Sequence, residues 1–169
     1  MGPAVAGAPL PDLALASTAG GRVALRRLGR PRAVVFAYPM TGRPGVPLPA
    51  GWEEIPGAVG CTAEACGFRD RHAALAGAGV EVYGLSTQGE ADQQEAVGRL
   101  GLPYPLLSDE AAAVADALGL PTFTAGGRRR YERLTLVVRA GVVEHVFHPV
   151  PDPAAHAAEV LAWLGGGGS

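Results

Sequence analysis

The chain has 169 residues, and 48% of them are apolar, which is enough for one domain with a substantial core. Its formal net charge of −2 gives no indication of a nucleic-acid partner or of an anionic membrane surface. It has no uncharged apolar run of about 18 residues and no early positive charge typical of a secretory signal. The sequence therefore predicts a cytoplasmic protein without a membrane segment, in which a disulfide would be transient and catalytic.

The strands are predicted from continuous apolar runs and from turn residues. Residues 10–28 predict a short hairpin, because two apolar stretches flank a turn at Gly20-Gly21. Residues 32–39, RAVVFAYP, predict a buried central strand that stops at proline, and residues 80–86, VEVYGLS, predict a second one. Residues 133–147 predict two strands around the turn Ala140-Gly141.

The first predicted helix contains both cysteines of the chain. Apolar positions in residues 61–78 step by four, three, four and three, which indicates one inward face of a helix. These positions are Cys61, Ala65, Phe68, His72 and Leu75. Cys61 is therefore expected on the inward face at the N-terminus of the helix.

Three further helices are predicted from their end signals. The segment from Thr87 to Glu90 fits a capping box for a helix ending near Gly101, and another helix runs from Ser108 to Gly119. The last begins at Asp152, with Pro153 at its first position. It directs four apolar side chains toward the core: Ala157, Val160, Leu161 and Leu164.

Strands alternating with helices predict an α/β protein with a thioredoxin-like fold: a central mixed sheet flanked by helices, with an N-terminal hairpin. We expect a single domain over residues 1–164 and a flexible Gly/Ser tail at 165–169. A Pro/Gly-rich insertion at about 40–59 is much longer than the roughly 2–6 residues of an ordinary strand-to-helix loop. We expect it to act as a lid or pocket wall held by Trp52 and Ile55; an insertion without a role is the alternative.

The two cysteines stand four residues apart, at Cys61 and Cys66. A thiolate at a helix N-terminus is stabilised by free N–H groups and by the helix dipole, which makes Cys61 the reactive candidate. In an ideal helix a five-residue step places the two Cα atoms roughly 8–9 Å apart, whereas a disulfide needs about 4.4–6.8 Å. The pair can bond only if the helix unwinds, which suits a sulfenic acid that forms in a pocket and then condenses with a second thiol.

The segment GCTAEACGFRD, residues 60–70, resembles the active-site helix of the peroxiredoxins, in particular of the bacterioferritin comigratory protein/PrxQ branch. The similarity extends over most of the chain, including VVFAYP, VEVYGLST and the strand pair that begins RLTLVV. The resemblance implies that Cys61 is the peroxidatic cysteine, that Cys66 is the resolving cysteine, and that Arg133 stabilises the thiolate and the peroxide oxygens. Glu64 either orients Arg133 or is an ordinary acid of the first helical turn.

One part of the family's pattern is interrupted. The family has a Pro-x-x-x-Thr-x-x-Cys loop, but Ala58 stands three residues before Cys61. Pro39 and Thr41, in YPMTG, resemble the first half of that loop, displaced by the insertion. We expect the Thr41 hydroxyl to reach the pocket if the insertion loops out, and Thr62 or a water to replace it otherwise.

The histidines and the arginine run indicate no further site. His145 and His148 would point to opposite faces of a strand, so no shared metal is expected. His72 is predicted in the core, His156 on a helix surface, and residues 126–133, GGRRRYER, in a solvated loop near the active site. No glycine-rich phosphate loop follows a strand, so no cofactor is expected.

The sequence thus predicts a thiol peroxidase that reduces hydrogen peroxide or organic hydroperoxides and is recycled by a thioredoxin-like dithiol. A thiol–disulfide exchange protein and a non-enzymatic redox sensor on the same fold are the alternatives. A monomer or a weak homodimer is expected from the resemblance.

Overall fold

A seven-stranded mixed sheet organises the molecule, which is a computed structural model that describes residues 5–55 and 57–166. The strand order is β2-β1-β5-β4-β3-β8-β9, and a separate two-stranded sheet pairs β6 with β7. The strands are β1 (Ala14–Ser17), β2 (Arg22–Ala24), β3 (Arg32–Ala37), β4 (Val80–Ser86), β5 (Leu106–Ser108), β6 (Thr122–Ala125), β7 (Arg128–Tyr131), β8 (Leu134–Arg139) and β9 (Val142–Phe147). The helices are α1 (Cys61–Gly77), α2 (Glu90–Leu100), α3 (Ala113–Leu118) and α4 (His156–Gly166), with short 3-10 turns η1 (Leu25–Arg27), η2 (Trp52–Glu54) and η3 (Pro153–Ala155).

Strand β3 lies inside the sheet, between β4 and β8, and packs against the cysteine helix. It runs parallel to β4 and antiparallel to β8, with Val35 opposite Tyr83 on one side and opposite Leu136 on the other. Alternate β3 side chains enter two different cores, because successive side chains of a strand point to opposite faces. Val34 and Phe36 pack in one core, and Val35 packs in the other.

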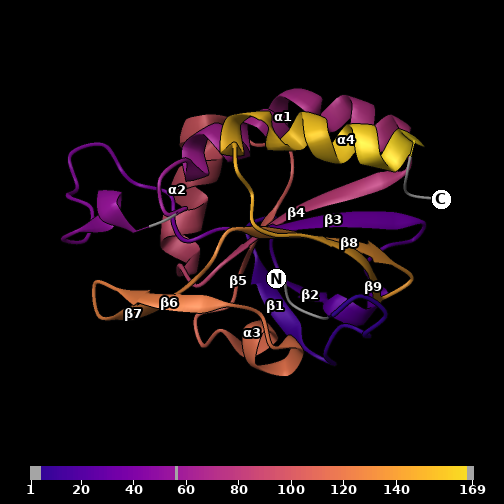
Figure 1. Cartoon of the computed structure of the whole chain (residues 1–169), viewed down its shortest axis with the longest axis horizontal. Helices are drawn as coiled ribbons and strands as arrows, with labels where there is room; N and C mark the ends of the chain where they lie inside the picture. The colour runs from indigo at the N-terminus through magenta and orange to yellow at the C-terminus, as the bar shows by residue number, and fades with distance from the viewer. Residues whose placement is uncertain (1–4, 56, 167–169) are drawn as a thin grey trace.

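The two cores correspond to the two covered faces of the sheet. Figure 1 shows α1, α2 and α4 on one face, and α3 with the N-terminal strands toward the other. The core beneath α1 includes the stacked rings of Phe36 and Phe68, whose centroids are 4.6 Å apart. This packing fixes α1 against β3 and sets the position of Cys61.

The insertion at 40–59 projects from one end of the molecule, beside the β6–β7 hairpin (Figure 1). Its described residues contain one short 3-10 turn, η2. Trp52 is buried and its ring centroid lies 6.0 Å from that of Phe123 in β6, within a small apolar cluster. Ile55 packs against the same cluster, so both residues expected to hold the insertion do so.

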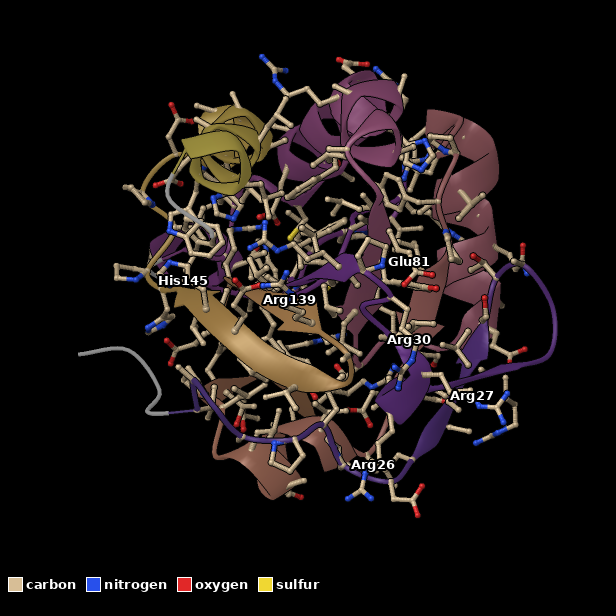
Figure 2. All side chains as sticks on the ribbon, turned by 90° about the vertical axis from the view of Figure 1, so that its right-hand side faces the viewer. Arg26, Arg27, Arg30, Glu81, Arg139 and His145 are labelled. Carbon is tan, nitrogen blue, oxygen red and sulfur yellow. The ribbon has the colours of Figure 1, made fainter. Side chains whose placement is uncertain are left out.

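The opposite end of the molecule carries several exposed arginines. Figure 2 shows Arg26, Arg27, Arg30 and Arg139 there. The segment before β3 is joined to the β8–β9 turn by a hydrogen bond of 2.6 Å from the Ala140 amide to the Gly29 carbonyl. This arginine-rich end lies away from the insertion, because Figure 2 views the right-hand side of Figure 1, whereas the insertion projects on the left.

The predicted N-terminal hairpin, the two central strands and the closing strand pair are confirmed, as is the cysteine helix. The last helix is confirmed over most of its length, with Val160 fully buried, but its predicted start at Asp152 and Pro153 is the 3-10 turn η3, and α4 itself begins at His156. The predicted tail at 165–169 is wrong for Gly165 and Gly166, which belong to α4, and residues 167–169 lie outside the described part of the chain.

Some sequence predictions of local structure are wrong. Thr87 does not cap α2: its hydroxyl donates to the Arg129 carbonyl at 2.6 Å, and Gly89 stands at the N-cap. Ser108 ends strand β5, which pairs with β4, so the next helix begins only at Ala113. The arginine run forms β7 rather than a solvated loop, and it buries Arg130 while Arg128 and Arg129 stay exposed.

Two histidines also differ from expectation. His156 is fully buried, with its Nε2 2.7 Å from the Thr135 hydroxyl, whereas it was expected on the surface. His72 is half-buried beside the Tyr104 ring and does not belong to the core. The spacing of apolar residues in the sequence does not show that η3 directs His156, the first residue of α4, toward Thr135 of β8.

Candidate active site

Cys61 is the first residue of α1, and it is 4% exposed. The preceding Gly60 has a φ of 116°, a conformation that L side chains rarely adopt. A Cβ at Gly60 would lie 2.8 Å from Pro153 Cγ, so α1 begins in close contact with η3. The sequence can place a thiol here only because the residue before it is glycine.

Arg133 reaches Cys61 from the residue preceding β8. Its Nη2 lies 3.2 Å from the Cys61 Sγ, and its Nη1 donates to Glu64 Oε1 at 2.7 Å. The same Nη2 lies within 3.1–3.4 Å of the carbonyl oxygens of Gly57, Ala58 and Val59. One guanidinium therefore ties together the thiol, the first turn of α1 and the end of the insertion.

Burial raises the pKa of the Cys61 thiol, while Arg133 and the Met40 backbone amide lower it and Glu64 raises it. The open N–H groups of α1 also favour the thiolate. Burial raises the pKa of Glu64 to about 7, with Arg133 acting in the opposite direction. Glu64 Oε2 has no partner among the described residues, which fits a carboxyl group that holds a proton near neutral pH.

Cys66 lies farther along α1 and is half-buried. Both cysteines are free thiols, and α1 is continuous from Cys61 to Gly77. The ideal helical separation of roughly 8–9 Å therefore applies, and it exceeds the span of a disulfide. No side chain caps the N-terminus of α1. Its first turn is held instead by the contacts of Arg133 with Cys61 and Glu64, which unwinding would have to break.

Comparison with known proteins assigns the chain to a family. The family model described as Redoxin matches residues 5–161. The chain belongs to the redoxin family. A relative named putative peroxiredoxin Q, chloroplastic, of Oryza sativa subsp. indica is 32% identical over 162 residues, covering 94% of this chain. The chain spans 65% of that relative's length.

Solved structures place this redoxin in the branch of peroxiredoxin Q and bacterioferritin comigratory protein. The structure of peroxidoxin BcpB from Mycobacterium tuberculosis is similar with a TM-score of 0.77 and 28% identity, over 98% of this chain and 99% of that one. A peroxiredoxin Q structure from Xanthomonas campestris gives a TM-score of 0.74 and 25% identity, over 96% and 99% of the two chains. The predicted branch and the predicted thioredoxin-like fold are thereby confirmed. A cytoplasmic location stays a prediction, since the rice relative is chloroplastic; no helix in the described residues is long and apolar enough to cross a membrane.

The structure of this redoxin engages Thr41 in hydrogen bonds with Gln88. The Thr41 hydroxyl donates to Gln88 Oε1 at 3.2 Å, its amide donates to the same oxygen, and the Gln88 side-chain amide donates to the Thr41 carbonyl. This three-bond clamp engages the Thr41 hydroxyl with Gln88, which precedes α2, and no hydrogen bond joins Thr41 to Cys61 in the described residues. A role of Thr41 at the thiol stays a prediction. The clamp residue Gln88 carries no sequence signal, because it lies 47 positions away from Thr41.

The neighbours of Thr41 in the interrupted motif are placed differently. Pro39 is buried two residues after the end of β3, and the backbone amide of the next residue, Met40, lowers the pKa of the Cys61 thiol. Thr62 is exposed and lines a hollow beside the thiol, so it is the one expected hydroxyl residue at this site. Met40 was missed at the sequence level, because a backbone donor leaves no side-chain signature.

The hollow beside Cys61 has a volume of about 290 Å³. The insertion contributes Leu48 and Trp52 to its wall, and Thr62 and Ala63 of α1 form another part. A second cavity of about 500 Å³ lies on the Arg133 side, lined by Val59, Glu132 and His148 among others. Cys61 thus lines the hollow beside the insertion, and Arg133, which contacts its sulfur, lines the second cavity.

Proposed function

We propose that this redoxin is a thiol peroxidase in which the Cys61 thiolate reduces hydrogen peroxide or an organic hydroperoxide. The observation that carries the proposal is the 3.2 Å contact between Arg133 Nη2 and the Cys61 Sγ at the N-terminus of α1. A permanent cation there stabilises the thiolate and the negative charge that develops on the peroxide oxygens.

In the first step the Cys61 Sγ attacks one peroxide oxygen while the O–O bond breaks. The sulfur becomes a sulfenic acid, and the other oxygen takes a proton and leaves as water or an alcohol. We propose that Arg133 binds the peroxide oxygens during this transfer, and the Met40 backbone amide, which lowers the pKa of the Cys61 thiol, also favours the reactive thiolate.

In the second step the Cys66 sulfur attacks the Cys61 sulfenic acid, water leaves, and a Cys61–Cys66 disulfide forms. The uncapped first turn of α1 must unwind for the two sulfurs to meet. An external dithiol, thioredoxin-like in chemistry, then reduces the disulfide and becomes oxidised itself. We propose that the enzyme acts as a monomer or weak homodimer.

Two cysteine variants test the scheme. Cys61→Ser is expected to abolish peroxide consumption, whereas Cys66→Ser is expected to keep one rapid turnover and lose recycling by thioredoxin. Stopped-flow peroxide consumption and mass spectrometry of the oxidised thiols measure both. Full peroxidase activity in Cys61→Ser would contradict the assignment.

A redox sensor is the second candidate, and one observation favours it. The Thr41 hydroxyl expected at the peroxide is engaged by Gln88, and Ala58 stands in the pocket wall. A rate constant for Cys61 oxidation near that of a free thiol, together with an oxidation-dependent binding partner, would favour the sensor over the peroxidase.

A further inference from the structure

The insertion forms a largely apolar wall of the hollow that Cys61 lines. Apart from the Cys61 thiol, the described residues that line the hollow offer only two polar side-chain groups, the Thr62 hydroxyl and the Trp52 indole N–H. The rest of the lining is apolar and includes Met40, Leu48, Ala58 and Val59. At about 290 Å³ the hollow is close to the roughly 300 Å³ at which pockets for small organic ligands begin.

This wall is built into the fold. Trp52 packs against Phe123 of β6 and shares a buried cluster with Ala58 and Ala125. A Cβ placed on Gly126 would lie 3.2 Å from Pro49 Cγ, so the β6–β7 turn touches the insertion closely beside Leu48. The hairpin thus packs against the insertion, and Leu48, next to Pro49, lines the hollow beside Cys61.

Apolar exposure is concentrated at this wall. Only four large apolar side chains of the described residues are exposed to solvent, and three of them belong to the segment between β3 and α1. Leu48 is 42% exposed and Val59 is 58% exposed, and both line the hollow; Val46 lies in the adjoining cavity. Clustered apolar exposure at a cavity mouth marks a surface that binds an apolar group.

The site offers few polar groups to a peroxide. Arg133 contacts the reacting sulfur and can serve one end of a peroxide, while the Thr41 hydroxyl is engaged by Gln88. Hydrogen peroxide would direct its second hydroxyl toward the apolar wall, where a polar group without a partner is costly. An alkyl hydroperoxide would place its hydrocarbon group there instead.

We propose that Leu48 of the insertion is a specificity-determining residue, which with Met40 and Trp52 holds the alkyl group of a bulky apolar hydroperoxide. The inference rests on the proposed peroxidase function and adds to it a preference for alkyl hydroperoxides over hydrogen peroxide. The preference comes from the insertion, not from the cysteine and arginine.

The test is the ratio of kcat/KM for cumene hydroperoxide to kcat/KM for hydrogen peroxide, measured with thioredoxin as reductant. We expect the unaltered protein to favour cumene hydroperoxide by about tenfold, since apolar pocket contacts discriminate by this order. Leu48→Asn is expected to lower the ratio about fivefold by slowing only the cumene reaction. Leu48→Met, which keeps an apolar side chain, is expected to retain the ratio.

Val142→Asn is the matched control, because Val142 is also exposed, at 38%, and lies at the β8–β9 turn away from the hollow. It is expected to leave the ratio unchanged. An unchanged ratio in Leu48→Asn, or a wild-type preference for hydrogen peroxide, would overturn this inference and leave the peroxidase assignment intact. Consumption of neither peroxide by the unaltered protein would instead overturn the proposed function and this inference together.

Discussion

At the scale of single residues, one cation serves two acids. Arg133 contacts the Cys61 sulfur and the Glu64 carboxylate, and the side chains of Arg133 and Glu64 are almost fully buried. Because burial raises the pKa of both acids, the positive charge of Arg133 decides how much of each is ionised. The two titrations are therefore coupled through Arg133.

Replacing the cation tests this coupling. Arg133→Met is expected to raise the pKa of the Cys61 thiol further, because burial then acts without the opposing charge. The rate constant for peroxide reduction at pH 7 should fall about 10²- to 10³-fold, as when one charge-stabilising donor is lost. Stopped-flow oxidation over a pH series measures both effects. Arg139→Met, an exposed arginine in β8, is the control, and a loss below threefold in Arg133→Met would contradict the role.

Glu64 predicts a pH dependence of stability. Its pKa of about 7 in the folded state lies above the ordinary value of 4.5. Between these values the folded state binds more protons than the unfolded state, so the free energy of unfolding falls as pH rises from about 4.5 to 7. The fall amounts to at most about 3 kcal/mol. Glu64→Gln should remove this component, while Glu53→Gln, at an exposed position, should keep it; urea titrations at pH 5 and pH 7.5 decide.

At the scale of elements, the start of α1 depends on a glycine. Gly60→Ala would force a side chain into a φ of 116° and place its Cβ 2.8 Å from Pro153 Cγ. We expect a loss of about 1–3 kcal/mol in the free energy of unfolding and slower peroxide reduction, because Cys61 must shift. Gly77→Ala is the matched control at the other end of α1, where a Cβ meets no atom within 4 Å. It should be neutral or stabilising by up to about 1 kcal/mol, and equal unfolding curves for both variants would refute the close contact.

Elements with a strong local pattern were predictable from the sequence. Strands β3 and β4 are continuous β-branched and apolar runs, and α1 shows its inward face in the spacing of Cys61, Ala65 and Phe68. Strand β5 and the β6–β7 hairpin were missed. Strand β5 has only three residues, and the arginines of β7 match no buried-strand pattern.

The site was predictable where it depends on position within an element, and not where it depends on long-range partners. The sequence placed Cys61 at a helix start and Arg133 at a strand start, and the structure brings them within 3.2 Å. The sequence did not show that the Thr41 hydroxyl donates to Gln88, which lies far along the chain. Nothing in the local sequence shows which partner a displaced hydroxyl will take.

At the scale of the whole molecule, the insertion and the β6–β7 hairpin form one apolar unit next to Cys61. Their shared cluster of Trp52, Phe123 and Ala125 is separate from the two main cores on the faces of the sheet. The geometry of the hollow therefore depends on a small core that can be weakened without unfolding the sheet. The arginine-rich end shown in Figure 2 takes no part in it.

Trp52→Ala tests whether this small core holds the insertion. Removing the indole takes away the contact with Phe123, so residues 40–59 should become much more sensitive to a protease of broad specificity. The sheet should remain folded, with a fall in Tm of only a few degrees, because the main cores do not contain Trp52. Mass spectrometry of the first cleavage products locates the cut.

The control is Trp163→Ala. Trp163 belongs to α4, and its indole stacks on His145 of β9, so the variant should leave cleavage of the insertion unchanged. Equal protection of residues 40–59 in the Trp52→Ala variant and the unaltered protein would show that the insertion keeps its position by its prolines alone.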